Sequence, residues 1–286
     1  MGLIYALGAY LSWGLVVPVH FRLLDGVPAS SILAHRIVWS AVLVAGLLAL
    51  LRRRLRNPFP LRPRHGLLVL SAGLIGVNWL LYLRAIQTGH MLDASLGYFI
   101  NPLMSVCLGA VVLGERMRAV QVAAVGIAAL AVLLAVVFAG ALPWVSLSLA
   151  ASFSLYGLVR KMVGVDAMIG FAAETLVLLP VALGYLLLVA PPVVQGDAAR
   201  AGLLLLTGIT TALPLIWYAA AAQRLTLATL GLMQYLAPTC LLALSVLVYG
   251  ERLEPHRALL FGLIWVALAV YAADAFRAAR RARASA

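Results

Sequence analysis

Polar and charged residues divide the chain into ten long apolar segments. At a helical rise of about 1.5 Å per residue, about twenty residues cover a hydrocarbon core of roughly 30 Å. The two-residue alternation typical of membrane strands is missing, so the pattern predicts an all-α integral membrane protein with ten transmembrane helices. The predicted spans are residues 3–21, 30–51, 66–86, 92–113, 119–139, 142–160, 167–190, 201–222, 226–249 and 257–276.

An internal repeat relates the two halves of the chain. The apolar run from Pro102 to Gly114-Glu115-Arg116 returns 136 residues later, from Pro238 to Gly250-Glu251-Arg252, with thirteen positions from proline to glutamate in each copy. Upstream, Tyr82 aligns with Tyr218 at the same offset. Such duplication is how many transporters are built. We expect a first repeat at residues 1–140, a second at 141–276 and a basic tail at 277–286.

Composition places the chain in a membrane. Apolar residues make up 65% of it and charged residues 10%, whereas a soluble protein is about 45–50% apolar. The net charge of +12 does not indicate nucleic-acid binding, because the arginines are not interleaved with a platform of aromatic residues. Basic clusters at 52–64 and 277–283 flank apolar segments, as expected next to anionic lipid headgroups, so lipids are expected partners.

The basic residues also predict the orientation. With the N-terminus inside, the inner loops and the tail carry fifteen basic residues and the outer loops carry five. This asymmetry predicts a multi-pass protein of the inner (cytoplasmic) membrane with both termini cytoplasmic. Equivalent points of the repeat are five spans apart, so Glu115 should lie inside and Glu251 outside. The halves are therefore predicted to be inverted five-helix repeats, an arrangement that suits alternating access.

Enzyme chemistry is not visible in the sequence. Metal-ligand spacings, nucleophile elbows and glycine-rich phosphate loops are missing, so we expect no enzyme activity, metal or cofactor. The two cysteines, Cys107 and Cys240, fall inside apolar spans, where we expect them to be small buried side chains.

Inserting a charged residue into a membrane span costs about 2.5–3.5 kcal/mol of free energy, so each such residue is expected to have a structural or functional role. His35 and Arg36 lie about two turns into the second span, and Glu174 occupies the equivalent place in the second half. Arg36 could reach the outer headgroups or attract an anionic ligand in a cavity. Arg36 and Glu174 could also form an ion pair between the halves or line a site for a zwitterion. Glu174 or His35 could carry a coupling proton.

Polar and aromatic residues deep in other spans are the second set of candidates. Tyrosine and tryptophan commonly mark membrane interfaces, so these residues could form either an interfacial belt or a cavity wall. Pro102 and Pro238 each remove a backbone hydrogen bond, and neighbouring amides could bind the freed carbonyls. The candidate substrate-binding residues of this set are Trp13, Trp79, Tyr98, Asn101, Gln234 and Tyr235. At Gly114-Glu115, a glycine that ends a helix and a carboxylate that follows it indicate a capping role.

Several motifs in order carry a family resemblance. They are YLSWG at 10–14, LAHR at 33–36, NWLLY at 78–82, ASLGYFINP at 94–102, LGER at 113–116, FSLYGLVRK at 153–161, TALPL at 211–215, LGLMQYLAP at 230–238 and YGE at 249–251. With these motifs the chain resembles the ten-span drug/metabolite transporter superfamily with two EamA-type repeats, and within it the RarD group. The resemblance covers residues 3–272. It implies a gradient-driven carrier in the cytoplasmic membrane, with its site between the halves.

We therefore expect a secondary active transporter that exports a small polar or amphipathic metabolite or drug by alternating access. The substrate could bear a carboxylate that Arg36 recognises, and aromatic side chains would supply apolar contact. One alternative is a flippase-like carrier of a lipid-linked intermediate. A less favoured one is an intramembrane enzyme. The sequence leaves open the substrate, the coupling ion and the oligomeric state.

Overall fold

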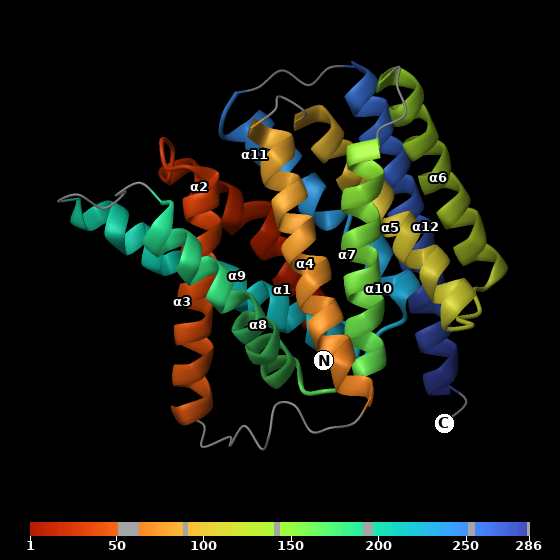
Figure 1. The fold of residues 1–286 in the computed structure, drawn as a ribbon. Coiled ribbons are helices and arrows are strands. Elements are labelled where there is room, and N and C mark those ends of the chain that lie inside the picture. The colour runs from red at the N-terminus through yellow and green to blue at the C-terminus, as the bar shows by residue number, and fades with distance from the viewer. Residues whose placement is uncertain (51–62, 88–90, 140–143, 191–196, 251–254, 285–286) are drawn as a thin grey trace.

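The computed structural model describes residues 1–50, 63–87, 91–139, 144–190, 197–250 and 255–284, and within these ranges it contains helices and no strand. Each predicted apolar segment corresponds to one helix or to a run of adjoining helices (Figure 1). The helices are α1 (Gly2–Leu11), η1 (Ser12–Val16), α2 (Val17–Leu23), α3 (Ala29–Leu50), α4 (Pro63–Gln87), α5 (Met91–Val112), α6 (Ala119–Ala139), α7 (Trp144–Val163), α8 (Ala167–Leu188), α9 (Ala198–Ala222), α10 (Leu227–Met233), α11 (Leu236–Leu247) and α12 (Pro255–Ala284).

Many of these helices have the length and composition of membrane spans. Within the described residues, 7 helical stretches are long and apolar enough to cross a bilayer. Two further apolar helices, Gly66–Tyr82 and Gly97–Val112, are shorter. Large apolar side chains such as Val111, Val181 and Leu187 are 74–84% exposed, as expected of side chains that face lipid.

Two of the predicted spans are interrupted, and proline contributes to both interruptions. The first span contains a π-helical turn, η1, directly before α2, which has Pro18 in its first turn. The ninth is divided between α10 and α11. Pro238 has no N–H to donate to the Gln234 carbonyl, which accepts from Ala237 N at 3.1 Å instead. By contrast, α5 continues through Pro102, so the two repeat-related prolines have different local structures.

The last helix extends beyond the predicted tenth span. α12 ends at Ala284, within the segment 277–286 that was expected to be a separate tail. That segment is rich in alanine and arginine, which are among the strongest helix formers, so the helix continues where the apolar sequence ends.

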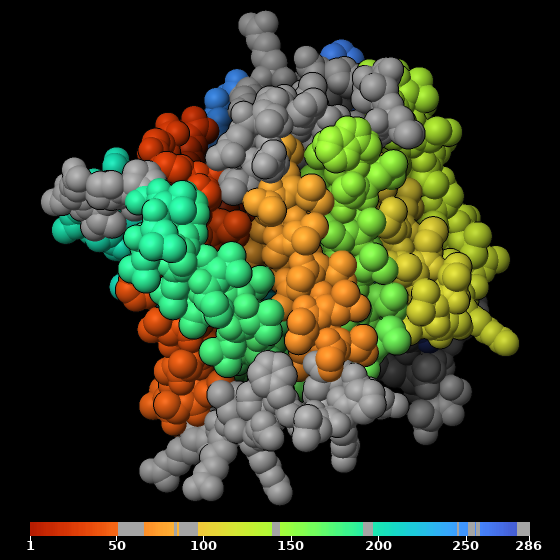
Figure 2. Space-filling view, in the orientation of Figure 1, coloured from red at the N-terminus to blue at the C-terminus, as the bar shows by residue number. Residues whose placement is uncertain are grey.

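The two halves of the sequence are interleaved. The most extensive helix contacts join a helix of residues 1–140 to one of residues 141–276: α5 with α7, α3 with α9, α4 with α7, α6 with α12, α3 with α8, α5 with α10, and α1 with α9. Figure 2 shows this on one face, where α4 lies between α8 on one side and α7 on the other. Each half therefore buries its apolar surface against the other.

Small residues allow close approach at these crossings. A Cβ atom on Gly208 of α9 would lie 2.6 Å from the carbonyl carbon of Trp39 in α3, and one on Gly231 of α10 would lie 2.6 Å from the Pro102 carbonyl oxygen in α5. Ala6, Ala9 and Ala212 are completely buried. Since lipid gives no hydrophobic drive for helix association, such close packing between small residues is a main source of stability.

Gly208→Ala should destabilise the protein by about 1–3 kcal/mol, because the added methyl meets the rigid backbone of Trp39. Gly202→Ala on the same helix is the matched control, since its Cβ would meet nothing within 4 Å. The control should be neutral or stabilising by about 0.4–1 kcal/mol. Thermal unfolding of the purified protein in detergent measures both. Equal midpoints for the two variants would contradict this packing.

Candidate functional site

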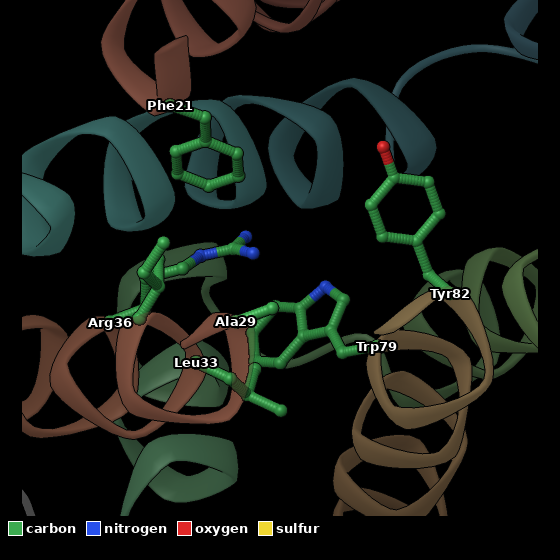
Figure 3. Close-up of a pocket in the computed structure, with 7 residues that line it drawn as sticks. Phe21, Ala29, Leu33, Arg36, Trp79 and Tyr82 are labelled. Carbon is green, nitrogen blue, oxygen red and sulfur yellow. The ribbon is translucent and has the colours of Figure 1, made fainter. Parts of the chain in front are cut away.

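A cavity lies between α2, α3 and α4, near the end of α2 and the start of α3. Its volume is about 70 Å³. Arg36 is the one charged residue among the seven that line it, and most of the others are apolar (Figure 3). The lining residues, all from the first half of the chain, are Phe21, Ala29, Ile32, Leu33, Arg36, Trp79 and Tyr82.

The second half contributes to this cavity by holding Arg36. Nε of Arg36 donates to the Thr211 hydroxyl on α9 at 2.9 Å. The guanidinium carbon lies 5.1 Å from the ring centre of Phe21 and 4.9 Å from that of Trp79. Figure 3 shows the guanidinium directed between these two rings into the open centre of the cavity, with Tyr82 across from it. Cation–π attraction of about 0.5–2 kcal/mol per contact favours this orientation.

Among the described residues, no carboxylate lies within ion-pair distance of Arg36. Glu174, the candidate partner in the other half, pairs instead with Arg160 of α7, whose Nη1 lies 3.4 Å from Oε1. Both side chains are buried, with 0% and 2% exposure. The Ser71 hydroxyl on α4 donates to Oε1, and the Tyr156 hydroxyl donates to Oε2 at 3.4 Å. Arg36 and Glu174 therefore do not form the ion pair that was one of the two sequence-based alternatives.

Arg160 is the last residue of the predicted span 142–160, and the count of fifteen inner basic residues took it as part of the inner loop that follows; the structure corrects this. Arg160 lies inside α7 and its side chain is fully buried. Nη2 donates to the Ala167 carbonyl at 3.0 Å, which ties the end of α7 to the start of α8. The buried carboxylate of Glu174, about two turns further along α8, holds the guanidinium in place, because a buried charge needs an opposite charge nearby.

His35 and Tyr98 lie next to this region without lining the cavity. His35 is half-buried, and its Nδ1 atom has no hydrogen-bond partner among the described residues. Tyr98 on α5 is 44% exposed, and its ring stands edge-on to that of Tyr82 with the centroids 6.2 Å apart. Tyr98 therefore adds a phenol to the wall beside the cavity.

Trp13 lies in the molecular core and not in the cavity. Its ring contacts those of Tyr10, Phe153 and Tyr218, with centroids 5.7–5.8 Å apart. Tyr156 stacks on Tyr218 in the same cluster, at 6.0 Å. These five rings join α1, η1, α7 and α9, and the Tyr156 hydroxyl connects them to Glu174. They form an aromatic cluster between the two halves.

The remaining candidates make backbone and side-chain contacts between helices. Asn101 is buried, and its Oδ1 atom accepts from the Ser154 hydroxyl at 2.5 Å. Tyr235 is completely buried and donates to the Phe99 carbonyl at 2.9 Å, which joins the α10–α11 break to α5 close to Pro102. Gln234 is buried at the same break. None of these three residues lines the Arg36 cavity.

Glu115 caps the N-terminus of α10, a helix in the other half of the chain, which the sequence did not predict. Gly114 ends α5 with a positive φ of 63°, and Glu115 N donates to the Gly109 carbonyl, as in a glycine C-cap. The carboxylate reaches the other half of the chain, where it accepts from the backbone N–H groups of Leu227 and Ala228 at 2.9 and 3.2 Å. Lys161 Nζ lies 3.3 Å from Oε1 and also donates to the Leu225 carbonyl. Glu251 lies outside the described residues.

Comparison with known proteins shows the family to which this chain belongs. Residues 1–137 match the model of the EamA-like transporter family. Protein RarD of Streptomyces exfoliatus is 46% identical over 296 residues, covering 99% of this chain and 91% of its own length. The chain belongs to the EamA-like transporter family, in its RarD group. It is a multi-pass membrane transporter.

Other relatives agree with this assignment, and a solved structure shares the fold. Protein RarD of Escherichia coli K12 is 43% identical, with 98% of this chain and 96% of the relative covered. An uncharacterized transporter of Vibrio cholerae is 44% identical, with 99% and 96% covered. One crystal structure has the same fold, with a TM-score of 0.77 at 19% identity over 94% of this chain and 96% of that one.

Sequence analysis missed several residues that organise this region. Phe21 and Thr211 position Arg36, and Ser71, Tyr156 and Arg160 surround Glu174. The internal repeat could have indicated the roles of Thr211 and Ser71. The sequence equates Arg36 in α3 with Glu174 in α8, and each bonds to a hydroxyl on the third span of the opposite half, α9 or α4. Arg160 gave no signal, because a basic residue near a span end is usually a loop residue.

Arg160→Leu should lower the free energy of unfolding by about 3–5 kcal/mol, because it leaves the Glu174 carboxylate buried without its charge partner. The double variant Arg160→Leu/Glu174→Leu should recover most of this loss, since no buried charge remains. A double-mutant cycle on the protein in detergent checks both values. Strictly additive effects of the two single substitutions would contradict the pairing.

Proposed function

We propose that this protein is a secondary active transporter that exports a small amphipathic metabolite across the cytoplasmic membrane by alternating access. The observation that carries the proposal is that the helix contacts occur in pairs related by the internal repeat. α4 packs on α7, and its repeat counterpart α9 packs on α1. In the same way, the contact of α3 with α9 matches that of α8 with α4, and the contact of α5 with α7 matches that of α11 with η1.

The remaining large contacts support the same symmetry. α3 packs on its own counterpart α8, α5 on α10, and α6 on α12. An axis that exchanges the halves would produce self-paired contacts of this kind. With an odd number of spans per repeat, the axis lies in the membrane plane, and the protein has two nearly equivalent conformations that open to opposite sides. Ten spans and cytoplasmic termini are part of this proposal.

The two ends of the bundle differ in a way that fits an outward-open conformation. At the proposed cytoplasmic end, Glu115 binds the N-terminus of α10 and Lys161, and the Arg160–Glu174 pair joins α7 to α8 above Ser71 of α4. The Arg36 cavity lies toward the proposed outer end. The aromatic cluster around Trp13 separates these two regions. In this conformation the substrate site is therefore open to the outside and closed to the cytoplasm.

Arg36 is the residue that we assign to substrate recognition. Burying a guanidinium without a carboxylate partner is costly, and an arginine inside a transporter that faces a cavity typically marks a ligand pathway. Trp79, Phe21 and Tyr82 supply apolar contact around it.

Cells that overproduce the wild-type protein should release a compound that cells overproducing Arg36→Ala at equal membrane levels do not release. Comparison of the metabolites in the medium identifies that compound. Arg200→Ala is a suitable control, because this exposed arginine pairs with Asp197 at the start of α9, outside the cavity. Identical profiles for wild type and Arg36→Ala would remove Arg36 from the transport path.

Glu115→Gln should open the cytoplasmic side, because hydrogen bonds to a charged group contribute about 1.5–3 kcal/mol. In a chain with Cys107 and Cys240 replaced by alanine, a cysteine at the buried Ser71 should react slowly with a charged thiol reagent. Glu115→Gln should raise its rate from the cytoplasmic side about tenfold or more. A cysteine at Leu33 should react from the outside.

Asp197→Asn is the matched control for this experiment, since Asp197 caps α9 through Arg200 N, at the other end of the bundle, and should leave the reactivity at position 71 unchanged. If the rate at position 71 stays the same in Glu115→Gln, the contact between Glu115 and α10 does not hold the cytoplasmic side closed.

A further inference from the structure

We infer that the Arg36 cavity binds the carboxylate of an organic monoanion with an apolar body, and that it discriminates against zwitterions and cations. This inference rests on the proposed function, and it specifies the chemical class of the substrate.

The orientation of Arg36 suits a carboxylate. Nε is engaged by Thr211, and the rings of Phe21 and Trp79 hold the guanidinium plane from two sides. Among the described residues, neither Nη atom donates a hydrogen bond to a neighbour, and both point into the cavity in Figure 3. A guanidinium presents its N–H groups as a rigid fork that matches the two oxygens of a carboxylate. Because Phe21 of α2 and Trp79 of α4 hold the guanidinium of Arg36 between them, a carboxylate can approach its N–H groups only from the cavity.

No residue that lines the cavity carries a negative charge that could bind a cationic group. None of the carboxylates that the structure describes lines the cavity. Glu174 pairs with Arg160, Glu115 with Lys161 and Asp274 with Arg118. Asp166 and Asp197 cap α8 and α9, and Asp25 accepts from Gly26 N in the turn between α2 and α3. The ammonium of a zwitterion bound at Arg36 would therefore lie near a like charge, with no carboxylate among the lining residues to pair with it. A cation would meet the same repulsion without the compensating carboxylate.

The side chains that line the cavity determine the chemical character of the rest of the ligand. Phe21, Ile32, Leu33 and Trp79 present apolar surface, and Tyr82 supplies a phenol. A ligand with two negative charges would place the second one against this surface with no cation to balance it. The cavity volume of about 70 Å³ accommodates a carboxylate and the first atoms attached to it, less than the roughly 300–1,000 Å³ of a pocket that encloses a whole drug-sized ligand. The apolar body of the ligand therefore extends out of the cavity in this conformation.

Three probes with the same ring test this inference: 3-phenylpropionate, the zwitterion phenylalanine and the cation 2-phenylethylammonium. Each is added at millimolar concentration to the purified full-length protein in detergent, and the midpoint of thermal unfolding is measured. A ligand that binds the folded protein raises this midpoint. We expect a concentration-dependent increase with 3-phenylpropionate alone. Arg36→Gln should abolish the increase, and Arg36→Lys, which keeps the charge without the fork, should weaken binding about tenfold or more.

Arg200→Gln is the control variant and should bind 3-phenylpropionate as the wild type does. Binding of phenylalanine or 2-phenylethylammonium as tight as that of 3-phenylpropionate overturns the inference, and so does the absence of any shift with 3-phenylpropionate. The three-probe comparison on the wild type stands even if the Arg36 variants fold poorly. The measurement uses no gradient, and the cysteine experiment uses no ligand, so failure of this inference and failure of alternating access are distinguishable.

Discussion

Polar groups inside a lipid-embedded bundle must find their partners within the protein, and this constraint organises the structure. Glu174 is surrounded by Arg160, Ser71 and Tyr156, which come from two other helices. Tyr235 donates to the backbone of α5, and the Glu115 carboxylate binds the backbone of α10. The contacts of Ser71 with Glu174, of Tyr235 with α5 and of Glu115 with α10 join opposite halves of the sequence, so these hydrogen bonds also hold the halves together. Arg36, which binds a neutral hydroxyl and two rings, differs from this pattern, and that difference marks it for ligand binding.

The same constraint gives the two ends of the bundle different properties. At one end, charged groups pair with each other, Glu115 with Lys161 and Glu174 with Arg160. The other contains a cavity lined by apolar side chains and a single cation. Packing between the ends is tight, since the aromatic cluster around Trp13 and the small residues at the helix crossings leave little space. In the transport cycle that we propose, the paired end would have to separate, whereas the cavity would have to close around Arg36.

Individual residues show how far the sequence could predict the site. Arg36 was selected because a charge inside a membrane span is energetically costly, and Trp79 because it is an amphipathic aromatic residue deep in a span. Both line the cavity. Trp13 was selected on the same grounds but lies in the core, because a buried aromatic residue has the same sequence signature in either place. The capping role expected of Gly114-Glu115 was correct for the glycine, whereas the carboxylate caps a helix 112 residues away. Arg160 was assigned to a loop, since sequence position does not show which way a long side chain points.

The sequence by itself determined the membrane environment, the helical class, the approximate spans and the internal repeat, because these depend on composition and on local periodicity. The family followed from motifs that extend along the whole chain. Only the tertiary structure decided which side chains meet, for example that Glu174 pairs with Arg160 and that Thr211 holds Arg36. Such pairings depend on how helices far apart in the sequence cross. The crossings are set by close packing of small residues such as Gly208 and Gly231, which carries no signal in the apolar pattern.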